Sequence, residues 1–245
     1  MIFPIGDTNV RGGAKPFFTY SFILINIVIF ILQTTVPGNL VCEFATIPGD
    51  IIKGQGFHTL ITSMFLHGGW MHLIGNMLFL WVFADNIEAI IGNKRFLWFY
   101  ILGGLIASGT HIFFDIIFQS GGSIACCMPC AKGSTCTIGD ILCQGSVPSL
   151  GASGAISAVM GAYIVMFPKS KVKVLILIFT IQVPAIIFLG LWFGGQLMAG
   201  VGSLDVVNAQ SAGVAWWAHI GGFVFGLIFG FFNRHLTSDL RLVTV

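Results

Sequence analysis

Two polar residues in otherwise apolar stretches of this sequence have the types needed for nucleophilic chemistry. Ser153 lies in the segment GASGAISAVMGAY, and His219 lies in WWAHIGGFVFG. A neutral imidazole beside a serine hydroxyl can take its proton and so make the oxygen a nucleophile. Each residue alone also has a plainer interpretation, because Gly-Ala-Ser-Gly suits close helix packing and a single histidine can be structural.

A second polar pair occurs in the segment HGGWMHLIGNMLF. His72 and Asn76 are four residues apart and therefore share one face of a helix. Their N–H groups are suitable donors to an oxyanion, although a hydrogen bond between helices is the alternative role. Asp85 and Glu88 lie at the other end of the candidate helix 71–91, so no carboxylate is placed to orient His219. The sequence therefore predicts a Ser–His dyad and not a triad.

The composition places these residues in a membrane. Of the 245 residues, 56% are hydrophobic and only 8% are charged, whereas soluble domains carry about 25% charged residues. The net charge of +2 is too small to argue for a nucleic-acid partner. We expect one integral membrane domain over residues 1–245, in contact with membrane lipids.

The apolar stretches predict an all-α bundle of six membrane-spanning helices, since a span needs about 20 mostly apolar residues. The candidate spans are 17–36, 71–91, 96–118, 151–167, 172–193 and 213–232. The fourth is short, so Ser153 at its beginning should lie within the membrane beside a loop that dips in. His219, His72 and Asn76 are expected at a similar depth, which predicts a single hydrated site.

Small residues recur every four positions after both candidate catalytic residues. Ser153, Ser157 and Gly161 form one such series, and Gly222, Gly226 and Gly230 form the other. Series of this kind allow helix backbones to approach closely. The fourth and sixth spans are therefore predicted to pack together and to bring Ser153 within reach of His219.

The basic residues predict the orientation. With both termini on one side, that side holds nine of the eleven basic residues: Arg11, Lys15, Lys94, Arg95, Lys169, Lys171, Lys173, Arg234 and Arg241. Lys53 and Lys132 lie on the other side. By the positive-inside rule, the segments 1–16 and 233–245 are expected in the cytoplasm, and the membrane is expected to be a bacterial cytoplasmic membrane.

Three outer connections are predicted, 37–70, 119–150 and 194–212, and all six cysteines fall in the first two. They are Cys42, Cys126, Cys127, Cys130, Cys136 and Cys143. On an oxidising side of the membrane they predict disulfides. The alternative is a metal site, because Cys127-x-x-Cys130 has a ligand-like spacing that Cys136 and Cys143 could complete.

Three motifs together resemble the rhomboid family of intramembrane serine proteases. They are His72-x-x-x-Asn76, Gly151-x-Ser153-Gly154 and Ala218-His219-x-x-Gly222-x-x-x-Gly226, in this order along a six-span chain. The resemblance implies an endopeptidase that cleaves single-span membrane proteins and uses no cofactor.

The resemblance also implies a role for each site residue. Ser153 would attack the carbonyl, and His219 would act as base and then as acid. Asn76, His72 and the Ser153 backbone N–H would hold the oxyanion. In this family the fifth span is commonly implicated in lateral access of the substrate, and Pro184 is expected to kink that span here.

One departure from the family and two alternative functions bear on this hypothesis. Many members carry an aromatic residue one turn after the serine; here that residue is Ser157, so Trp216 or Trp217 is the candidate for packing on His219. A catalytically silent relative that binds membrane-protein clients would usually lack the serine or the histidine. A channel or transporter would spread polar residues through the depth of the membrane, and here they gather at one end.

Overall fold

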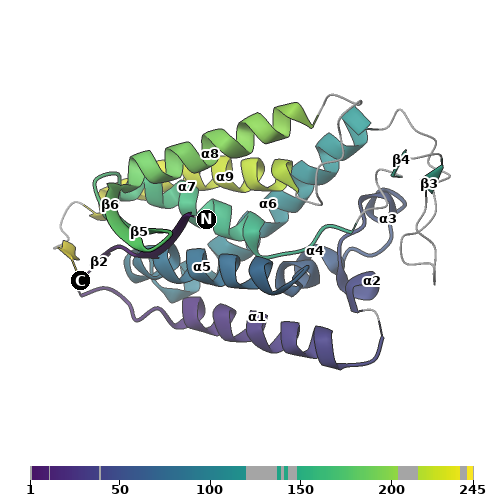
Figure 1. The fold of residues 1–245 in the computed structure, drawn as a ribbon, viewed down its shortest axis with the longest axis horizontal. Coiled ribbons are helices and arrows are strands. Elements are labelled where there is room, and N and C mark those ends of the chain that lie inside the picture. Colours follow the sequence, from purple (N-terminus) through teal and green to yellow (C-terminus); the bar gives the residue numbers. More distant parts are fainter. Residues whose placement is uncertain are drawn as a thin grey trace.

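The computed structural model describes residues 2–10, 12–38, 40–119, 137–138, 141–142, 148–203, 215–237 and 242–244. Its architecture is a bundle of long helices with the shorter α7 in the middle (Figure 1). The long elements are α1 (Phe17–Thr35), α5 (Trp70–Ile91), α6 (Asn93–Gln119), α7 (Ser153–Met166), α8 (Ala185–Gly202) and α9 (Trp216–Asn233). Within the described ranges, α1, α5, α6, α8 and α9 are long and apolar enough to cross a membrane. The predicted all-α membrane bundle is confirmed.

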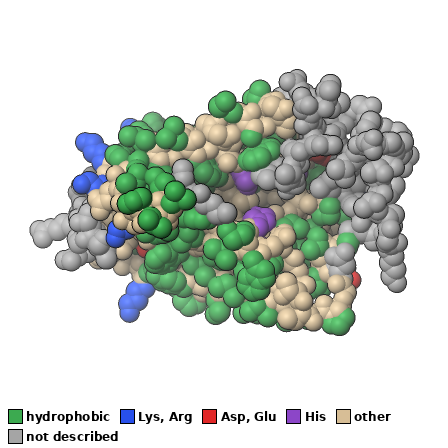
Figure 2. All heavy atoms as spheres, viewed as in Figure 1, with side chains coloured by type: hydrophobic (Ala, Val, Ile, Leu, Met, Phe, Trp, Pro, Cys, Tyr) green, Lys and Arg blue, Asp and Glu red, His purple; other side chains and the backbone are tan. Residues whose placement is uncertain are grey.

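Short elements occupy the two ends of the bundle. One end holds α2 (Leu40–Phe44), α3 (Pro48–Ile52), α4 (Thr59–Thr62), η1 (Ser63–Phe65), β3 (Thr137–Ile138) and β4 (Ile141–Leu142). The other holds β1 (Ile2–Gly6), β2 (Thr8–Val10), β5 (Lys171–Ile176), β6 (Phe179–Pro184), η2 (Arg234–Thr237) and β7 (Leu242–Thr244). Lysine and arginine side chains gather at this second end, which we call the basic end, and apolar side chains cover much of the face between (Figure 2).

The predicted fifth span, 172–193, is wrong in its first half. Residues 171–184 form the β5–β6 hairpin, and β1 joins it in an antiparallel sheet of order β1-β5-β6. Along β5, Lys171 and Lys173 are exposed while Val172 and Val174 are buried. This alternation has the period of a strand, and β-branched residues favour strands. High apolar content over the whole segment therefore did not mean a helix.

The helix that follows the hairpin starts and ends later than predicted. Pro184 is the N-cap residue of α8 and introduces no kink into it. The helix continues to Gly202, through residues that were predicted to begin an outer connection. This shift brings Trp192 and Gln196 onto the same helix, one turn apart.

The packing of α7 against α9 confirms in part the prediction from small residues. A Cβ atom at Gly222 or Gly226 would collide with a backbone carbonyl of α7. The facing residues on α7 are Gly154, Ala158 and Ala162, one position along from the predicted series. Of that series, Gly161 does meet α9, whereas Ser157 is fully buried and donates its hydroxyl to the Ser153 carbonyl at 2.6 Å. The two backbones are therefore in direct contact.

Helix α1 lies at the edge of the bundle and is held at its two ends. Near its start, Glu88 of α5 accepts hydrogen bonds from the Phe18 N–H, the Thr19 N–H and the Thr19 hydroxyl at 2.7–2.8 Å. Near its end, the Gln33 amide donates to the His67 carbonyl at 2.6 Å and accepts from the His67 N–H at 3.1 Å. Both attachments use residues that follow α1 in the sequence.

A buried polar cluster joins the N-terminal segment to the basic ends of α5 and α7. Asp7 accepts hydrogen bonds from the Asn86 amide, at 2.8 Å, and from the Tyr163 hydroxyl. Tyr163 also lies 2.8 Å from the Ser170 hydroxyl, and Asn86 bonds to the Val10 N–H and the Thr8 carbonyl. The cluster fixes the end of α7 that is remote from Ser153.

The cysteine predictions concern mainly residues outside the described part. Cys42 is disulfide-bonded. Cys126, Cys127, Cys130, Cys136 and Cys143 lie outside the described residues, and so does the metal alternative built on four of them.

Candidate active site

Ser153 is the first residue of α7, and the segment before it is tightly constrained. The Ser149 backbone exchanges two hydrogen bonds with Thr46, at 2.8 and 3.0 Å, and the Gly151 N–H donates to the Ser63 carbonyl at 2.9 Å. Gly151 has φ 119°, a conformation that L side chains rarely adopt, and a Cβ atom there would lie 2.9 Å from the His72 ring. This segment thus requires glycine, and it presents the Ser153 N–H at a helix N-terminus, where it lacks an intrahelical acceptor.

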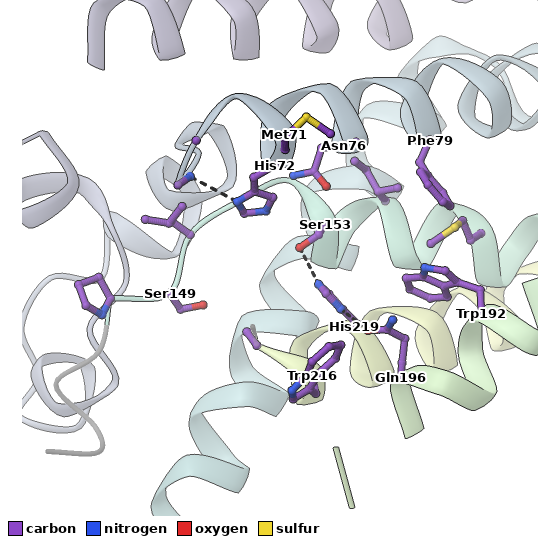
Figure 3. A pocket seen from close by; sticks show the side chains of 18 residues that line it. Met71, His72, Asn76, Phe79, Ser149, Ser153, Trp192, Gln196, Trp216 and His219 are labelled. Atoms are coloured by element: carbon purple, nitrogen blue, oxygen red, sulfur yellow. Dashed lines mark hydrogen bonds between the residues drawn. The ribbon is translucent and has the colours of Figure 1, made fainter. Parts of the chain in front are cut away.

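The structure brings Ser153 and His219 into a hydrogen bond. Ser153 Oγ lies 2.7 Å from His219 Nε2 (Figure 3). The two side chains come from α7 and α9, whose backbones touch through Gly222 and Gly226. Close backbone packing therefore sets the distance between a hydroxyl and an imidazole, which is the arrangement of a nucleophile and a general base.

The other imidazole nitrogen of His219 also has a partner, which sequence reasoning missed. Gln196 Oε1 of α8 lies 2.6 Å from His219 Nδ1. An amide oxygen only accepts hydrogen bonds, so Nδ1 carries the proton and Nε2 is free to accept from Ser153. Gln196 was missed because it was assigned to the connection 194–212. Its one signal is a lone amide inside an apolar segment, FGGQLMAG.

Aromatic rings from two helices surround the His219 imidazole. Trp216, one of the two residues predicted to pack on His219, lies edge-on to the imidazole, with the two ring centroids 6.3 Å apart. Trp192 of α8 lies 6.0 Å away and was not foreseen. Trp217, the other candidate, instead stacks on Phe114 at 3.6 Å. The position left without an aromatic side chain at Ser157 is thus compensated by rings from α8 and α9.

His72 and Asn76 reach the same site from α5 (Figure 3). The Gly68 N–H donates to His72 Nδ1 at 3.3 Å, so in the neutral ring the proton is on Nε2, the side that faces Gly151. Asn76 is 8% exposed, and among the described residues its Nδ2 has no hydrogen-bond acceptor. Buried donors of this kind are usually satisfied. An unpaired amide N–H next to the serine is therefore available to an incoming oxygen.

All four predicted residues line one cavity of about 750 Å³. Its walls come from α5, the segment before α7, and the helices α7, α8 and α9. Apolar side chains form much of its lining, among them Met71, Phe79, Ile156 and Met160. A largely apolar cavity with a few convergent polar groups is typical of a ligand or active site.

Within the described residues, five long apolar helices pack around the shorter α7, and Ser153 at the start of α7 is hydrogen-bonded to His219 of α9. These features define a multi-span membrane protein with a paired serine and histidine inside the bundle. Residues 54–235 match the family profile of the Rhomboid domain. The chain belongs to the rhomboid family.

Several characterised relatives are similar to this chain. The Rhomboid protease GluP of Bacillus subtilis is 29% identical over 98% of this chain and 41% of its own length. RHOMBOID-like protein 12, mitochondrial, of Arabidopsis thaliana is 32% identical over 71% of this chain and 45% of its own. Presenilin-associated rhomboid-like protein A, mitochondrial, of Danio rerio is 28% identical over 69% and 35%. The chain spans less than half the length of each of these relatives.

Proposed function

We propose that this protein is an intramembrane serine endopeptidase that cleaves single-span membrane proteins with a Ser153–His219 dyad. The observation that carries the proposal is the 2.7 Å hydrogen bond between Ser153 Oγ and His219 Nε2, beside Asn76 Nδ2, which has no acceptor among the described residues. Membership of the rhomboid family, which includes a relative named as a protease, supports the same chemistry.

The proposed reaction has two stages. Ser153 Oγ attacks the substrate carbonyl carbon while its proton passes to His219 Nε2, and the carbonyl oxygen becomes an oxyanion. His219 then gives that proton to the leaving amine nitrogen as the peptide C–N bond breaks. In the second stage a water molecule, deprotonated by His219, attacks the acyl-enzyme carbon and releases the carboxyl product, with Ser153 regaining its proton.

Three donors are proposed to hold the oxyanion. They are Asn76 Nδ2, the Nε2–H of neutral His72 and the Ser153 backbone N–H. Their value lies in being fixed before charge develops, since loss of one such donor typically costs about 10²–10³ in rate. The helix N-terminus at Ser153 adds favourable dipole potential.

The cavity supports access of the substrate between α5 and α8. Phe79 of α5 and Trp192 of α8 line it, and their ring centroids are 6.4 Å apart. Aromatic contacts, which can be exchanged for contacts with a substrate, join the two helices at this point. A membrane-embedded peptide that enters between α5 and α8 would reach the Ser–His pair without leaving the membrane.

The orientation and domain organisation belong to the same proposal. The basic end would face the cytoplasm of a bacterial inner membrane, with residues 1–16 and 233–245 on that side and 119–150 on the outer side. Residues 1–245 would form one rhomboid-type domain. The competing function is that of a catalytically silent relative that binds membrane-protein clients.

The decisive experiment replaces the nucleophile and keeps the fold. Ser153→Ala should abolish cleavage of a single-span test substrate and labelling by a serine-reactive fluorophosphonate, with thermal unfolding in detergent unchanged. Ser157→Ala is the matched control, since Ser157 is buried one turn further along α7 and outside the cavity, and it should keep most activity. If Ser153→Ala cleaves the substrate at the wild-type rate, the serine-protease hypothesis is wrong and the client-binding alternative is favoured.

A further inference from the structure

We propose that Gln196 is a positioning residue that sets the tautomer of His219, so that the Ser–His pair is competent only while α8 is docked against α9. The proposal rests on the proposed function for its kinetic consequence. Its structural part concerns His219 alone and is testable without any substrate.

The hydrogen-bond chemistry of the three side chains gives the first argument. Gln196 Oε1, at 2.6 Å from His219 Nδ1, requires a proton on that nitrogen. A neutral imidazole carries one N–H, so Nε2 must then hold a lone pair, directed at Ser153 Oγ 2.7 Å away. Without the Gln196 oxygen the proton can move to Nε2, and the lone pair that should accept the serine proton is lost.

Gln196 is the only side-chain partner that the described residues offer to Nδ1. Of the hydrogen bonds to the His219 ring in the described part of the chain, one comes from Gln196 and the other from Ser153. Trp192 and Trp216 contribute ring contacts, which limit the tilt of the imidazole but fix no proton. The selection of the tautomer therefore depends on one amide oxygen.

The attachment of α8 gives the second argument. Its buried residues are Ala185 and Leu189 near its start and Gly200 near its end. Between them, a Cβ atom added at Gly190, Gly194 or Gly195 would have no described atom within 4 Å. The middle of α8 is held instead by side-chain contacts, among them the ring of Phe193, which stacks on Phe223 of α9 at 4.3 Å. Gln196 and Trp192 are thus the contacts through which the middle of α8 meets His219.

The tautomer of His219 therefore depends on the position of α8. A hydrogen bond of 2.6 Å is lost beyond about 3.5 Å, so an outward movement of α8 by little more than an ångström releases Nδ1. When α8 moves away to admit a substrate, His219 loses its preferred tautomer. When α8 returns, Gln196 restores it, and cleavage is thereby confined to the closed bundle.

The first test reads the tautomer directly. Protein labelled with ¹⁵N-histidine, reconstituted in detergent, is compared by NMR with His219→Gln to assign the His219 signals. The wild type should show a protonated Nδ1 and an unprotonated Nε2, and Gln196→Leu should show the reverse or a mixture. Gln182→Leu, the same change at an exposed residue of β6, should leave the wild-type pattern.

The second test reads the rate. Gln196→Leu should lower kcat at least tenfold with KM little changed, because the tautomer concerns proton transfer and not substrate binding. Gln196→Glu keeps the acceptor oxygen and should restore kcat, with the acid limb of the pH–rate profile moved to higher pH, because a carboxylate stabilises the imidazolium ion. A purely structural glutamine would give no such rescue and no such shift.

The outcomes separate this proposal from the proposed function. If Gln196→Leu keeps the wild-type tautomer, or cleaves at the wild-type rate, the positioning role is overturned while the protease stands. If the wild-type protein cleaves no single-span substrate, the proposed protease function is wrong. The NMR result alone then still decides whether Gln196 sets the tautomer of His219.

Discussion

Helices α8 and α9 are each 18 residues long and strongly apolar, and each contains several glycines, yet they use these glycines in opposite ways. In α9, an added Cβ at Gly221, Gly222, Gly226 or Gly230 would strike a neighbouring helix. In α8, Gly190, Gly194, Gly195 and Gly202 face open space within the described part of the molecule. Both helices contain glycine, but a glycine allows close packing only where a neighbouring helix lies against it.

The difference divides the candidate site into a fixed part and an adjustable part. Ser153 and His219 are set by backbone contact between α7 and α9 at Gly222 and Gly226. Gln196 and Trp192 reach His219 from α8, whose middle meets α9 through side chains, such as Phe193 stacked on Phe223 at 4.3 Å. The distance between Ser153 and His219 is thus fixed by α7 and α9, whereas the position of the proton on the His219 ring depends on α8.

The largest expected effect comes from filling the contact at Gly226. Gly226→Val places side-chain atoms against the Ala158 carbonyl, and backbone atoms cannot swing aside. Overpacking a core typically costs about 1–3 kcal/mol, so we expect a clear loss of stability in thermal unfolding in detergent. Gly194→Val makes the same change on α8 and should have little effect; equal losses for both variants would show that the two helices do not differ.

A smaller addition one turn earlier should act on the rate more than on stability. The methyl group of Gly222→Ala would meet the Gly154 carbonyl, directly after Ser153. Moving the serine away from His219 by a fraction of an ångström should lower fluorophosphonate labelling by roughly tenfold, which corresponds to about 1.4 kcal/mol in the barrier. Gly195→Ala is the control on α8. Unchanged labelling of Gly222→Ala would mean that the α7–α9 contact does not set the dyad.

The third prediction concerns the far end of the fixed part, where Asp7 meets Tyr163 of α7. Burial raises the pKa of Asp7 from 3.8 to about 8; the nearby Asp85 adds to this, while hydrogen bonds from Tyr163 and Asn86 oppose it. The folded chain thus keeps a proton that the unfolded chain releases. The stability contributed by this protonated carboxyl is fully present below about pH 4 and is lost as the pH rises to about 8.

Asp7→Asn tests this linkage, because asparagine resembles the neutral acid and cannot ionise. Unfolding temperatures measured between pH 5 and pH 9 should fall more steeply for the wild type than for the variant. Parallel curves would show that Asp7 does not hold a proton in the folded chain.

The smallest effect is expected for Gly194→Ala on α8. Alanine in place of a helical glycine with open space around it typically stabilises by about 0.5–1 kcal/mol. The unfolding temperature should therefore rise slightly, without loss of fluorophosphonate labelling. A decrease in stability would place an unrecognised neighbour against this face of α8.

Sequence patterns correctly predicted the helices in which the apolar residues show no strand-like alternation. The spans 17–36 and 71–91 differ from α1 and α5 by one residue at an end. The segment after Ser170 failed because apolar content does not distinguish a buried strand from a span, although the exposed lysines at alternate positions in β5 carry the strand period. The single misplaced boundary then removed Gln196 from consideration.

The candidate site shows the same division between local and non-local information. Ser153, His219, His72 and Asn76 could be selected because each is a polar residue in an apolar helix, and they do line one cavity; their catalytic roles stay predictions. The partner of His219 Nδ1 could not be selected, since it depends on the rotation of α8 about its axis. That rotation depends on how α8 packs against α7 and α9, which no pattern within the segment describes.

The attachment of α1 has a consequence for the order of assembly during synthesis. This helix is synthesised before the side chains that hold its two ends: His67 follows Gln33 by 34 residues, and Glu88 follows Thr19 by 69. At translation rates of about 5–20 residues per second, the second delay is roughly 3 to 14 seconds. For that interval the backbone N–H groups of Phe18 and Thr19 lack the Glu88 carboxylate that pairs with them in the folded chain. Helix α1 therefore gains its hydrogen bonds to Glu88 only after most of α5 has been synthesised.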